Sequence, residues 1–282
     1  MQNQNAFGGQ LIGGTVTGCQ AKLRVMTVLR VLVALPFGLA FGSFLTVVIH
    51  RAPAGESLVA PRSRCPSCGT QLRNVDNVPV VSWLLLRGRC RSCGTRISPV
   101  YPLIELATAA LFVAAALRFD RVWPAVVVAP FLGLMAALAV IDWRHKIIPN
   151  RVVYPSLLAF PALLVAGALA SGGIDLVRAG IGFLAYGGGL LLVAIASPRG
   201  MGMGDVKLAA LIGLVLGSLG LAYVGVAAGL GILLGGVGAI VALLLGAGRK
   251  QKLPFGPFLA AGAILAAFLA PRIADAYLRL LR

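Results

Sequence analysis

Long apolar runs without a charged residue are the main feature of the sequence. Five of them contain 19 to 23 residues, the length that a helix needs to cross the hydrocarbon core of a bilayer: 31–49, 122–141, 152–174, 179–198 and 253–271. A sixth run, 97–117, carries Glu105 as its only charge. The uncharged run 208–248 has 41 residues and can cross twice with a turn at 217–220. The pattern therefore predicts an all-α polytopic membrane protein with eight transmembrane helices.

Composition and charge support this interpretation and orient the helices. Of the 282 residues, 59% are hydrophobic and 12% charged, which is far from the average of a soluble domain. Eight arginines lie between Arg51 and Arg96, so the positive-inside rule predicts that this segment is cytosolic. The loops around Arg144, Arg199 and Arg249 fall on the same side by parity. We interpret the net charge of +17 as topology and attraction to the lipid bilayer, not as nucleic-acid binding.

These patterns divide the chain into four parts. Residues 1–24 are polar and glycine-rich and are expected to form a flexible N-terminal tail, in which Cys19 is a spare thiol. Residues 25–49 form the first transmembrane helix. Residues 50–100 form a small cytosolic domain between helices one and two, and residues 101–282 form a seven-helix membrane core.

Four cysteines can stabilise this small domain, because a domain of about fifty residues has too small a hydrophobic core to be stable without a metal or a crosslink. Two C-x-x-C knuckles, Cys65 with Cys68 and Cys90 with Cys93, are separated by 21 residues, and each is followed by glycine. Four thiolates at this spacing predict a closed, structural zinc site in a ribbon-like domain. Two disulfides are the alternative, which needs an oxidising compartment, and free thiols are another.

The acidic residues are few enough to sort by topology. Of the eight, Glu105, Asp142 and Asp205 are expected at a common depth near the cytosolic border of the membrane, where unpaired carboxylates are functional candidates. For Asp142 the alternative is pairing with a nearby Arg144, His145 or Lys146. For Asp205 it is capping of a helix N-terminus.

The residues around Asp205 favour a catalytic role. Glycines at 200, 202 and 204 predict irregular backbone that another chain can approach closely, and Lys207 could hold this kink or steady the carboxylate. Two aspartates brought together share a proton, so that one accepts a proton from water while the other donates to a carbonyl. This chemistry hydrolyses peptide bonds. His50 and His145 have no matching Ser or Cys, and we do not expect them to be catalytic.

The chain resembles the bacterial type IV prepilin peptidases, membrane aspartic proteases of the GxGD type. Seven stretches in order carry the resemblance: GSFLTVVIHRAP (42–53), PRSRCPSC (61–68), DNVPVVSWLLLRGRCRSC (76–93), YPLIEL (101–106), IDWRHKIIPN (141–150), GMGMGDVKLAA (200–210) and PFGPFLAAG (254–262). The resemblance implies an inner-membrane enzyme that cuts the basic leader of prepilins or pseudopilins after a Gly at the cytosolic face, with Asp142 and Asp205 as its catalytic pair. It also implies N-methylation of the new N-terminus with S-adenosylmethionine.

Some residues depart from the family pattern. Thr46, Val100 and Asn150 stand where many relatives have Asn, Arg and Asp, and no glycine-rich nucleotide loop is visible, so the residues that bind the methyl donor are unknown. The PFGP turn at 254–257 is expected to start the last span rigidly. Two other classes stay open: a proton-coupled transporter with Asp142 and Asp205 as a relay, and a scaffold whose zinc module binds a partner.

Overall fold

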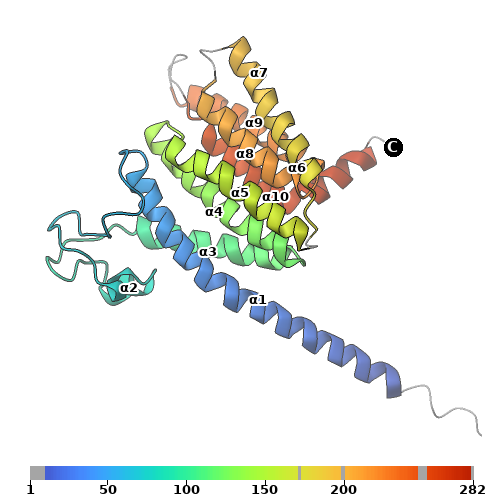
Figure 1. The fold of residues 1–282 in the computed structure, drawn as a ribbon, viewed down its shortest axis with the longest axis horizontal. Helices are drawn as coiled ribbons and strands as arrows, with labels where there is room; N and C mark the ends of the chain where they lie inside the picture. Colours follow the sequence, from blue (N-terminus) through green and yellow to red (C-terminus); the bar gives the residue numbers. More distant parts are fainter. Residues whose placement is uncertain (1–9, 171–172, 198–200, 247–252, 281–282) are drawn as a thin grey trace, which may run out of the picture.

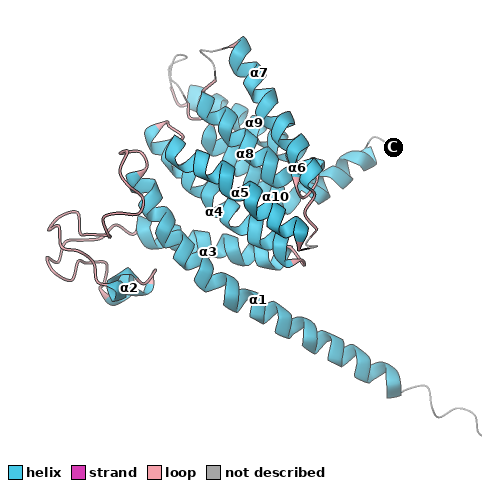
Figure 2. Ribbon diagram, viewed as in Figure 1, coloured by secondary structure: helices cyan, strands magenta, loops and turns pink. Residues whose placement is uncertain are grey.

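The protein is almost entirely helical. The computed structural model describes residues 10–170, 173–197, 201–246 and 253–280, and for 10–23 the backbone alone. Within them, extended pairing is limited to two isolated bridges, Arg64 with Gln71 and Arg89 with Arg96 (Figure 2). The helical elements are α1 (Gln10–Arg51), η1 (Asn74–Asn77), α2 (Val81–Leu85), α3 (Val100–Arg118), α4 (Val122–His145), α5 (Asn150–Leu169), α6 (Leu176–Gly182), η2 (Phe183–Gly188), α7 (Gly189–Ala196), α8 (Met203–Gly217), α9 (Leu221–Leu244) and α10 (Gly256–Leu280).

Seven helices in the described part of the chain are long and apolar enough to cross a membrane: Arg24–Arg51, Val100–Arg118, Val122–His145, Asn150–Leu169, Leu176–Ala196, Leu221–Leu244 and Gly256–Leu280. Each matches one of the apolar runs, which confirms a polytopic all-α fold. The run 208–248 breaks at Ser218–Gly220, where the sequence predicts a turn. Its first half is the short helix α8, which accounts for the eighth predicted span.

Helix α1 is longer than its apolar run suggests. It begins at Gln10 and projects far beyond the other helices (Figure 1), so residues 10–24 are helical and not a flexible tail. The physical reason is that no proline interrupts the sequence before Pro36, so the helix of the apolar run can propagate toward the N-terminus. Residues 1–9, the Cys19 side chain and Gly200 lie outside what the structure describes.

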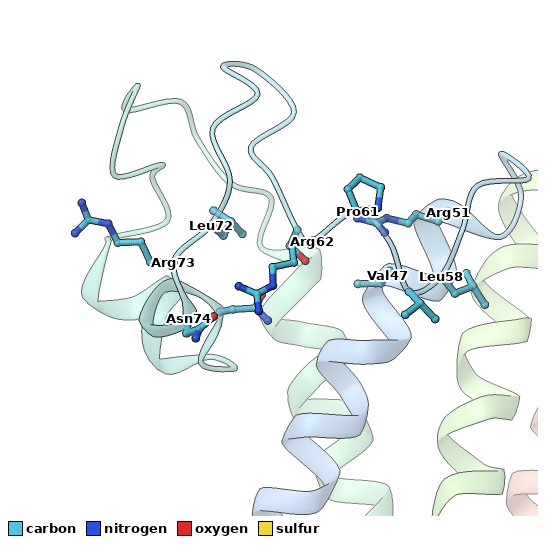
Figure 3. Close-up of a pocket in the computed structure, with 11 residues that line it drawn as sticks. Val47, Arg51, Leu58, Pro61, Arg62, Leu72, Arg73 and Asn74 are labelled. Atoms are coloured by element: carbon cyan, nitrogen blue, oxygen red, sulfur yellow. The ribbon is translucent and has the colours of Figure 1, made fainter.

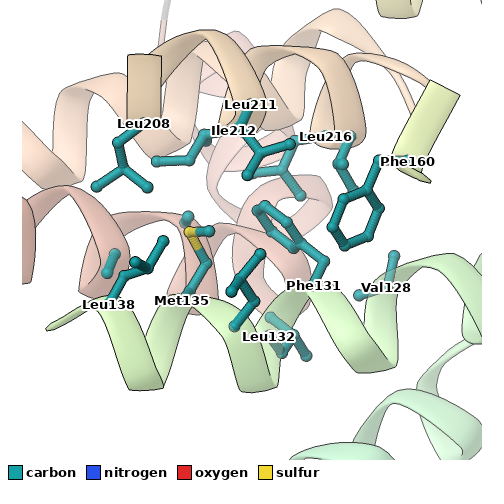
Figure 4. Close-up of a cluster of buried hydrophobic side chains, with 14 of the residues drawn as sticks. Val128, Phe131, Leu132, Met135, Leu138, Phe160, Leu208, Leu211, Ile212 and Leu216 are labelled. Atoms are coloured by element: carbon teal, nitrogen blue, oxygen red, sulfur yellow. The ribbon is translucent and has the colours of Figure 1, made fainter. Parts of the chain in front are cut away.

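Helix α8 forms the centre of the bundle. It contacts α4, α5, α6, η2, α7, α9 and α10, and ten of its fifteen residues are buried. Figure 4 shows Leu208, Ile212 and Leu216 of α8 facing Phe131, Met135 and Leu138 of α4, with Phe160 of α5 closing one end. These apolar contacts fix α4 and α8 against each other, and hence the positions of the acids that they carry.

Glycines allow the neighbouring helix to approach α8 closely. A β-carbon at Gly182 or at Gly213 would collide with the backbone of the other residue, so only glycine fits at this crossing. The helix that carries Gly182 continues from α6 into α7 through the π-helical segment η2. Apolar periodicity did not predict this segment, because a π-bulge adds a residue without changing composition.

The buried position of α8 explains its length. Fifteen residues rise about 22 Å, less than the 30 Å hydrocarbon core, which a helix surrounded by protein need not span. At the far end, the Asp175 amide before α6 donates to the Ser218 carbonyl after α8 (3.1 Å). The bond between Asp175 and Ser218 puts the start of α6 and the end of α8 at the same level. From there the continuous helix Leu176–Ala196, with 21 residues, rises about 31 Å, whereas α8 rises about 22 Å. The first turn of α8 therefore lies roughly 9 Å deeper in the protein than the end of α7.

Candidate active site and metal cluster

The four cysteines of the two knuckles converge on one point. Their Sγ atoms all lie within 4.8 Å of one another, and those of Cys65 and Cys93 are 3.8 Å apart. All four are free thiols. Zn–S bonds of 2.3 Å in a tetrahedron place sulfur atoms about 3.8 Å apart, whereas a disulfide needs about 2.05 Å. The cluster can therefore hold a metal ion, as the spacing predicted.

The two knuckles have nearly the same backbone. The Cys65 amide donates to the Thr70 carbonyl (2.9 Å) and the Cys90 amide to the Thr95 carbonyl (2.8 Å). Gly69 and Gly94 close the turns at φ of +70° and +69°, which only glycine adopts without strain. Hydrogen bonding with Thr95 lowers the pKa of the Cys93 thiol to about 6, which favours the thiolate that metals bind.

Asp142 lies one turn before the end of α4 and is buried, with 5% of its surface exposed. The described residues give it no ion pair, so the pairing with Arg144, His145 or Lys146 that we considered is not present. Its Oδ2 instead accepts a hydrogen bond from the Gly256 amide at the start of α10 (3.0 Å). The Lys146 amide bonds the Asp142 carbonyl (2.8 Å) and ends the helix in a left-handed conformation, which turns the chain toward α5.

Asp205 is in the first turn of α8 and is partly buried. It does not cap the helix, because the N-cap position is Gly202 and no side-chain hydrogen bond caps the helix there. Its carboxylate lies close enough to that of Asp142 for the two charges to repel each other. Two acids that are 63 positions apart in the sequence thus lie within electrostatic range of each other.

The expected supporting residues surround Asp205 in different ways. A β-carbon at Gly204 would lie 3.0 Å from Cβ of Ile148, so glycine lets the loop after α4 pack against α8. At Gly202 a β-carbon would be 3.4 Å from Oδ2 of Asp205, an ordinary contact. Lys207 Nζ donates to Asn150 Oδ1 (2.9 Å) and lies 4.7 Å from the Tyr154 ring centroid. It therefore joins α8 to α5, and its contacts among the described residues do not include a hydrogen bond or ion pair with Asp205.

Glu105, the third acid of the predicted common depth, is not part of this pair. It is buried in α3, and its Oε2 accepts a hydrogen bond from the Val80 amide of the cysteine domain (2.7 Å). His50 stacks on Tyr101, with ring centroids 4.9 Å apart. The first contact fastens the cysteine domain to α3, and the second joins the ends of α1 and α3 to each other.

Two cavities lie between the cysteine domain and the membrane helices. The larger, of about 1080 Å³, is lined by the His50 and Tyr101 rings and by the carboxylates of Glu56, Asp76 and Glu105. The smaller, of about 230 Å³, lies at the end of α1 and includes Arg51 and Arg62 (Figure 3). Neither is lined by Asp142 or Asp205.

Comparison with known proteins agrees with this arrangement. The sequence model of the Type IV leader peptidase family matches residues 129–270, which contain both aspartates, and the Bacterial Peptidase A24 N-terminal domain matches 36–119, which contain the cysteine cluster. The chain belongs to the type IV leader peptidase family. No solved structure matches it at a significant level.

Curated members of the family are similar over almost their whole length. A protein of Bacillus subtilis (strain 168) is 39% identical over 86% of this chain and 96% of its own. Proteins of Stutzerimonas stutzeri and Pseudomonas aeruginosa are 34% and 33% identical over 89% and 88% of this chain. All three bear the name "Prepilin leader peptidase/N-methyltransferase".

Sequence reasoning missed one contributor to the site, the Gly256 amide. The PFGP turn marked a rigid start for the last span, and α10 does begin at Gly256. That its first amide points at Asp142 depends on how α10 packs against α4, which the motif alone does not encode. In this member of the leader peptidase family, a β-carbon at Gly256 would lie 2.6 Å from Asp142 Oδ2, so the position has no room for a side chain.

Proposed function

We propose that this protein is a prepilin leader peptidase of the bacterial inner membrane, with its active site facing the cytosol. It cleaves the basic leader of a type IV prepilin or pseudopilin after a Gly. Membership of the leader peptidase family and the names of the relatives support the activity. The arginines that precede and follow the cysteine domain support the orientation.

The approach of Asp142 and Asp205 is the observation that carries the proposal. Two carboxyl groups within electrostatic range of each other in a partly buried site cannot both ionise easily, so we expect them to hold one proton between them. The Gly256 amide binds one oxygen of Asp142 and fixes its orientation. This bond and the nearby Asp205 support a division of acid and base roles between the two groups.

The pair can hydrolyse an amide as follows. The ionised carboxylate takes a proton from a water molecule while the water oxygen bonds to the carbonyl carbon, and the protonated partner donates its proton to the carbonyl oxygen. The tetrahedral intermediate then breaks its C–N bond: the carboxyl that took the proton from water gives it to the leaving nitrogen, and the other carboxylate takes back a hydroxyl proton as the C=O bond re-forms. A Gly at the cleaved position suits a recessed site, because its backbone can pass between the carboxyl groups without a side chain.

Zinc is the metal that fits the four thiolates best, and its role here is structural. A closed four-cysteine site leaves no open coordination position for water, and the cluster does not line the site of Asp142 and Asp205. The metal instead holds the domain that carries Val80 and its bond to Glu105. Loss of the ion is expected to affect the domain and its contacts before the cleavage chemistry.

The second activity in the relatives' names, N-methylation, needs a methyl donor, for which S-adenosylmethionine is the chemical candidate. When bound, it supplies the methyl group. The larger cavity has the volume of a cofactor site, and its stacked His50 and Tyr101 rings suit an adenine ring, while Arg51, Arg64 and Arg96 line it beside the carboxylates. His50 of this cavity is within electrostatic range of Arg144 and His145, at the end of α4 that carries Asp142.

Co-expression with a substrate tests the peptidase. The substrate has a basic start, a Gly, then Phe and an apolar stretch with Glu five residues after the cut. Asp142→Asn and Asp205→Asn should each lower cleavage by about 10³-fold or more, because each acid has a role that the other cannot fill. The product is measured by mass spectrometry of the substrate N-terminus.

Glu105→Gln is the matched control, since it removes a third membrane-border carboxyl that has no acidic partner and keeps an acceptor for Val80. It should cleave close to the wild-type rate. Full processing by either aspartate variant would reject the pair and favour the transporter alternative, in which the same acids carry protons and no substrate is cut.

A further inference from the structure

Helix α2 of the cysteine domain presents an apolar surface that none of the residues described in the structure covers. Val81, Leu84 and Leu85 are 49%, 61% and 79% exposed. Their spacing of three and four residues puts them on one side of the helix, which we call the α2 face. The preceding residues Val75 and Val78 are also exposed, at 66% and 44%. A patch of this kind on a small water-exposed domain needs a partner.

The contacts of α2 hold this face outward. The Val80 amide, just before the helix, donates to Glu105 of α3 (2.7 Å). Within the helix, Trp83 Nε1 donates to the Ile97 carbonyl (3.1 Å), and the Trp83 ring packs beneath Gly88. The first bond attaches the residue before α2 to α3, and the second attaches Trp83 of α2 to the segment that leads into α3. The α2 face is therefore on the side away from the protein.

The depth of α2 along the membrane helices identifies what lies there. Glu105, which binds Val80, packs against Gly42 of α1, nine residues and thus about 13 Å before the end of that helix at Arg51. The uncharged run 31–49 of α1 has 19 residues and a rise of about 28 Å, close to the thickness of the hydrocarbon core, and Gly42 lies seven residues, about 10 Å, before its end. Glu105 therefore lies at the depth of the acyl chains, and α2, whose preceding residue Val80 is bonded to the Glu105 side chain, lies beside the outer part of this region.

The picture agrees with this estimate. Figure 3 shows the short helix that follows Asn74 level with the last turns of α1, beside the helices and not beyond them. The loops on either side of it, which carry the knuckles, extend past the end of α1. Arg87 and Arg89, both exposed, follow α2 directly and add positive charge at the same place.

We propose that the α2 face inserts into the adjacent leaflet and that Arg87 and Arg89 bind the phosphates of anionic phospholipids there. Apolar residues on one side of a short helix with basic residues beside them are the chemistry of an interfacial membrane contact. The cysteine domain is then held at two points, by Glu105 inside the protein and by lipid outside it. This inference does not depend on the peptidase activity.

Photo-crosslinking in the full-length protein tests the proposal. A benzophenone amino acid replaces Leu85, and a matched probe replaces Ser92, which is equally exposed but lies in a knuckle loop. The protein is reconstituted in phosphatidylglycerol vesicles and irradiated, and adducts are identified by mass spectrometry. Lipid adducts at position 85 should exceed those at 92 by at least about fivefold, because only position 85 reaches the acyl boundary.

Two further variants separate the apolar and the charged contributions. With the probe at Val81, Leu84→Ser together with Leu85→Ser should lower the lipid adducts by about half or more, since the helix loses most of its apolar area. Arg87→Gln with Arg89→Gln should lower them in phosphatidylglycerol and not in phosphatidylcholine. Zinc content reports that each variant is folded. Equal adducts at 85 and 92, or crosslinking of 85 to a second protein chain in place of lipid, would overturn the proposal.

Discussion

Two buried carboxyl groups of this protein have nearly the same hydrogen bonding and different neighbours. Glu105 is 8% exposed and accepts the Val80 amide, and Asp142 is 5% exposed and accepts the Gly256 amide. Both bonds join segments that are distant in sequence. Beside Asp142 lies a second carboxylate, Asp205, whereas Glu105 has the Ser43 side chain.

This difference separates a structural acid from a reactive one. A lone carboxyl that is fully hydrogen-bonded has nothing to exchange a proton with, so its role is to hold two elements together. A pair of carboxyls can divide acid and base roles between its members. Burial and one backbone bond are therefore insufficient to mark an active site, and the acidic neighbour is the informative feature.

The largest effect is expected from removal of the metal cluster, because the domain that it stabilises supplies the Val80 amide to Glu105. Structural zinc contributes about 10–16 kcal/mol in zinc-finger peptides, so Cys65→Ser with Cys68→Ser should release the ion and unfold the domain that supplies Val80. We expect lower protein abundance and methylation, with cleavage per folded molecule less affected. Zinc analysis of purified protein provides the measurement, and a variant that kept one zinc per chain would show that the ligand set is wrong.

A single methyl group added at Gly256 should displace the carboxyl group of Asp142. In Gly256→Ala the new β-carbon would lie 2.6 Å from Oδ2 of Asp142, so the carboxyl group must move. A shift of this size at a reacting group costs about 10²-fold in rate. Cleavage kinetics should show a lower kcat with unchanged zinc content. Gly236→Ala on α9 is the control, since a β-carbon there meets nothing within 4 Å; equal rates for the two variants would separate Gly256 from the chemistry.

Replacement of Glu105 should affect stability and spare the chemistry. Glu105→Leu leaves the Val80 amide without its acceptor, which costs about 1–3 kcal/mol, whereas Glu105→Gln keeps an acceptor and should cost less. Thermal unfolding in detergent is the measurement, with cleavage at low temperature as the second readout. If Glu105→Gln abolished cleavage while the protein stayed folded, Glu105 would belong with the reactive acids.

The smallest effect is expected from an ion pair inside the cysteine domain. Hydrogen bonds from Arg91, the closest 2.7 Å, hold the pKa of Asp76 below its usual range. The pair therefore stabilises the fold above the ordinary pKa of an aspartate, and this stabilisation is lost as the pH falls through the lowered value. Asp76→Asn should lower the melting temperature slightly at pH 7, less than Glu105→Leu does. The same decrease in an Arg91→Gln background would show that the two residues do not interact.

The sequence predicts those features that depend on local composition. Uncharged runs located the spans, and the C-x-x-C spacing located the four ligands of the cluster. The arginine loops put Asp142 and Asp205 on one side of the membrane, and the glycines before Asp205 indicated irregular backbone. These properties hold whatever the helices pack against.

Other features depend on packing between distant segments. The bonds from Gly256 to Asp142 and from Val80 to Glu105 arise from how helices meet, and neither motif contains its partner. The common depth of three acids did not reveal that Glu105 lies apart from the other two. The length of α8 also escaped prediction, because hydropathy does not distinguish a helix surrounded by lipid from one surrounded by protein.

The short central helix has a consequence for whatever enters the site. A substrate segment that crosses the bilayer as a helix has its backbone amides hydrogen-bonded within the helix. None of these amides is accessible to hydrolysis. With the first turn of α8 set back roughly 9 Å, a strand can descend to Asp205 only after it has unwound. The rate of cleavage should therefore depend on how easily the substrate helix unwinds near the membrane border, as well as on the residues around the cleaved bond.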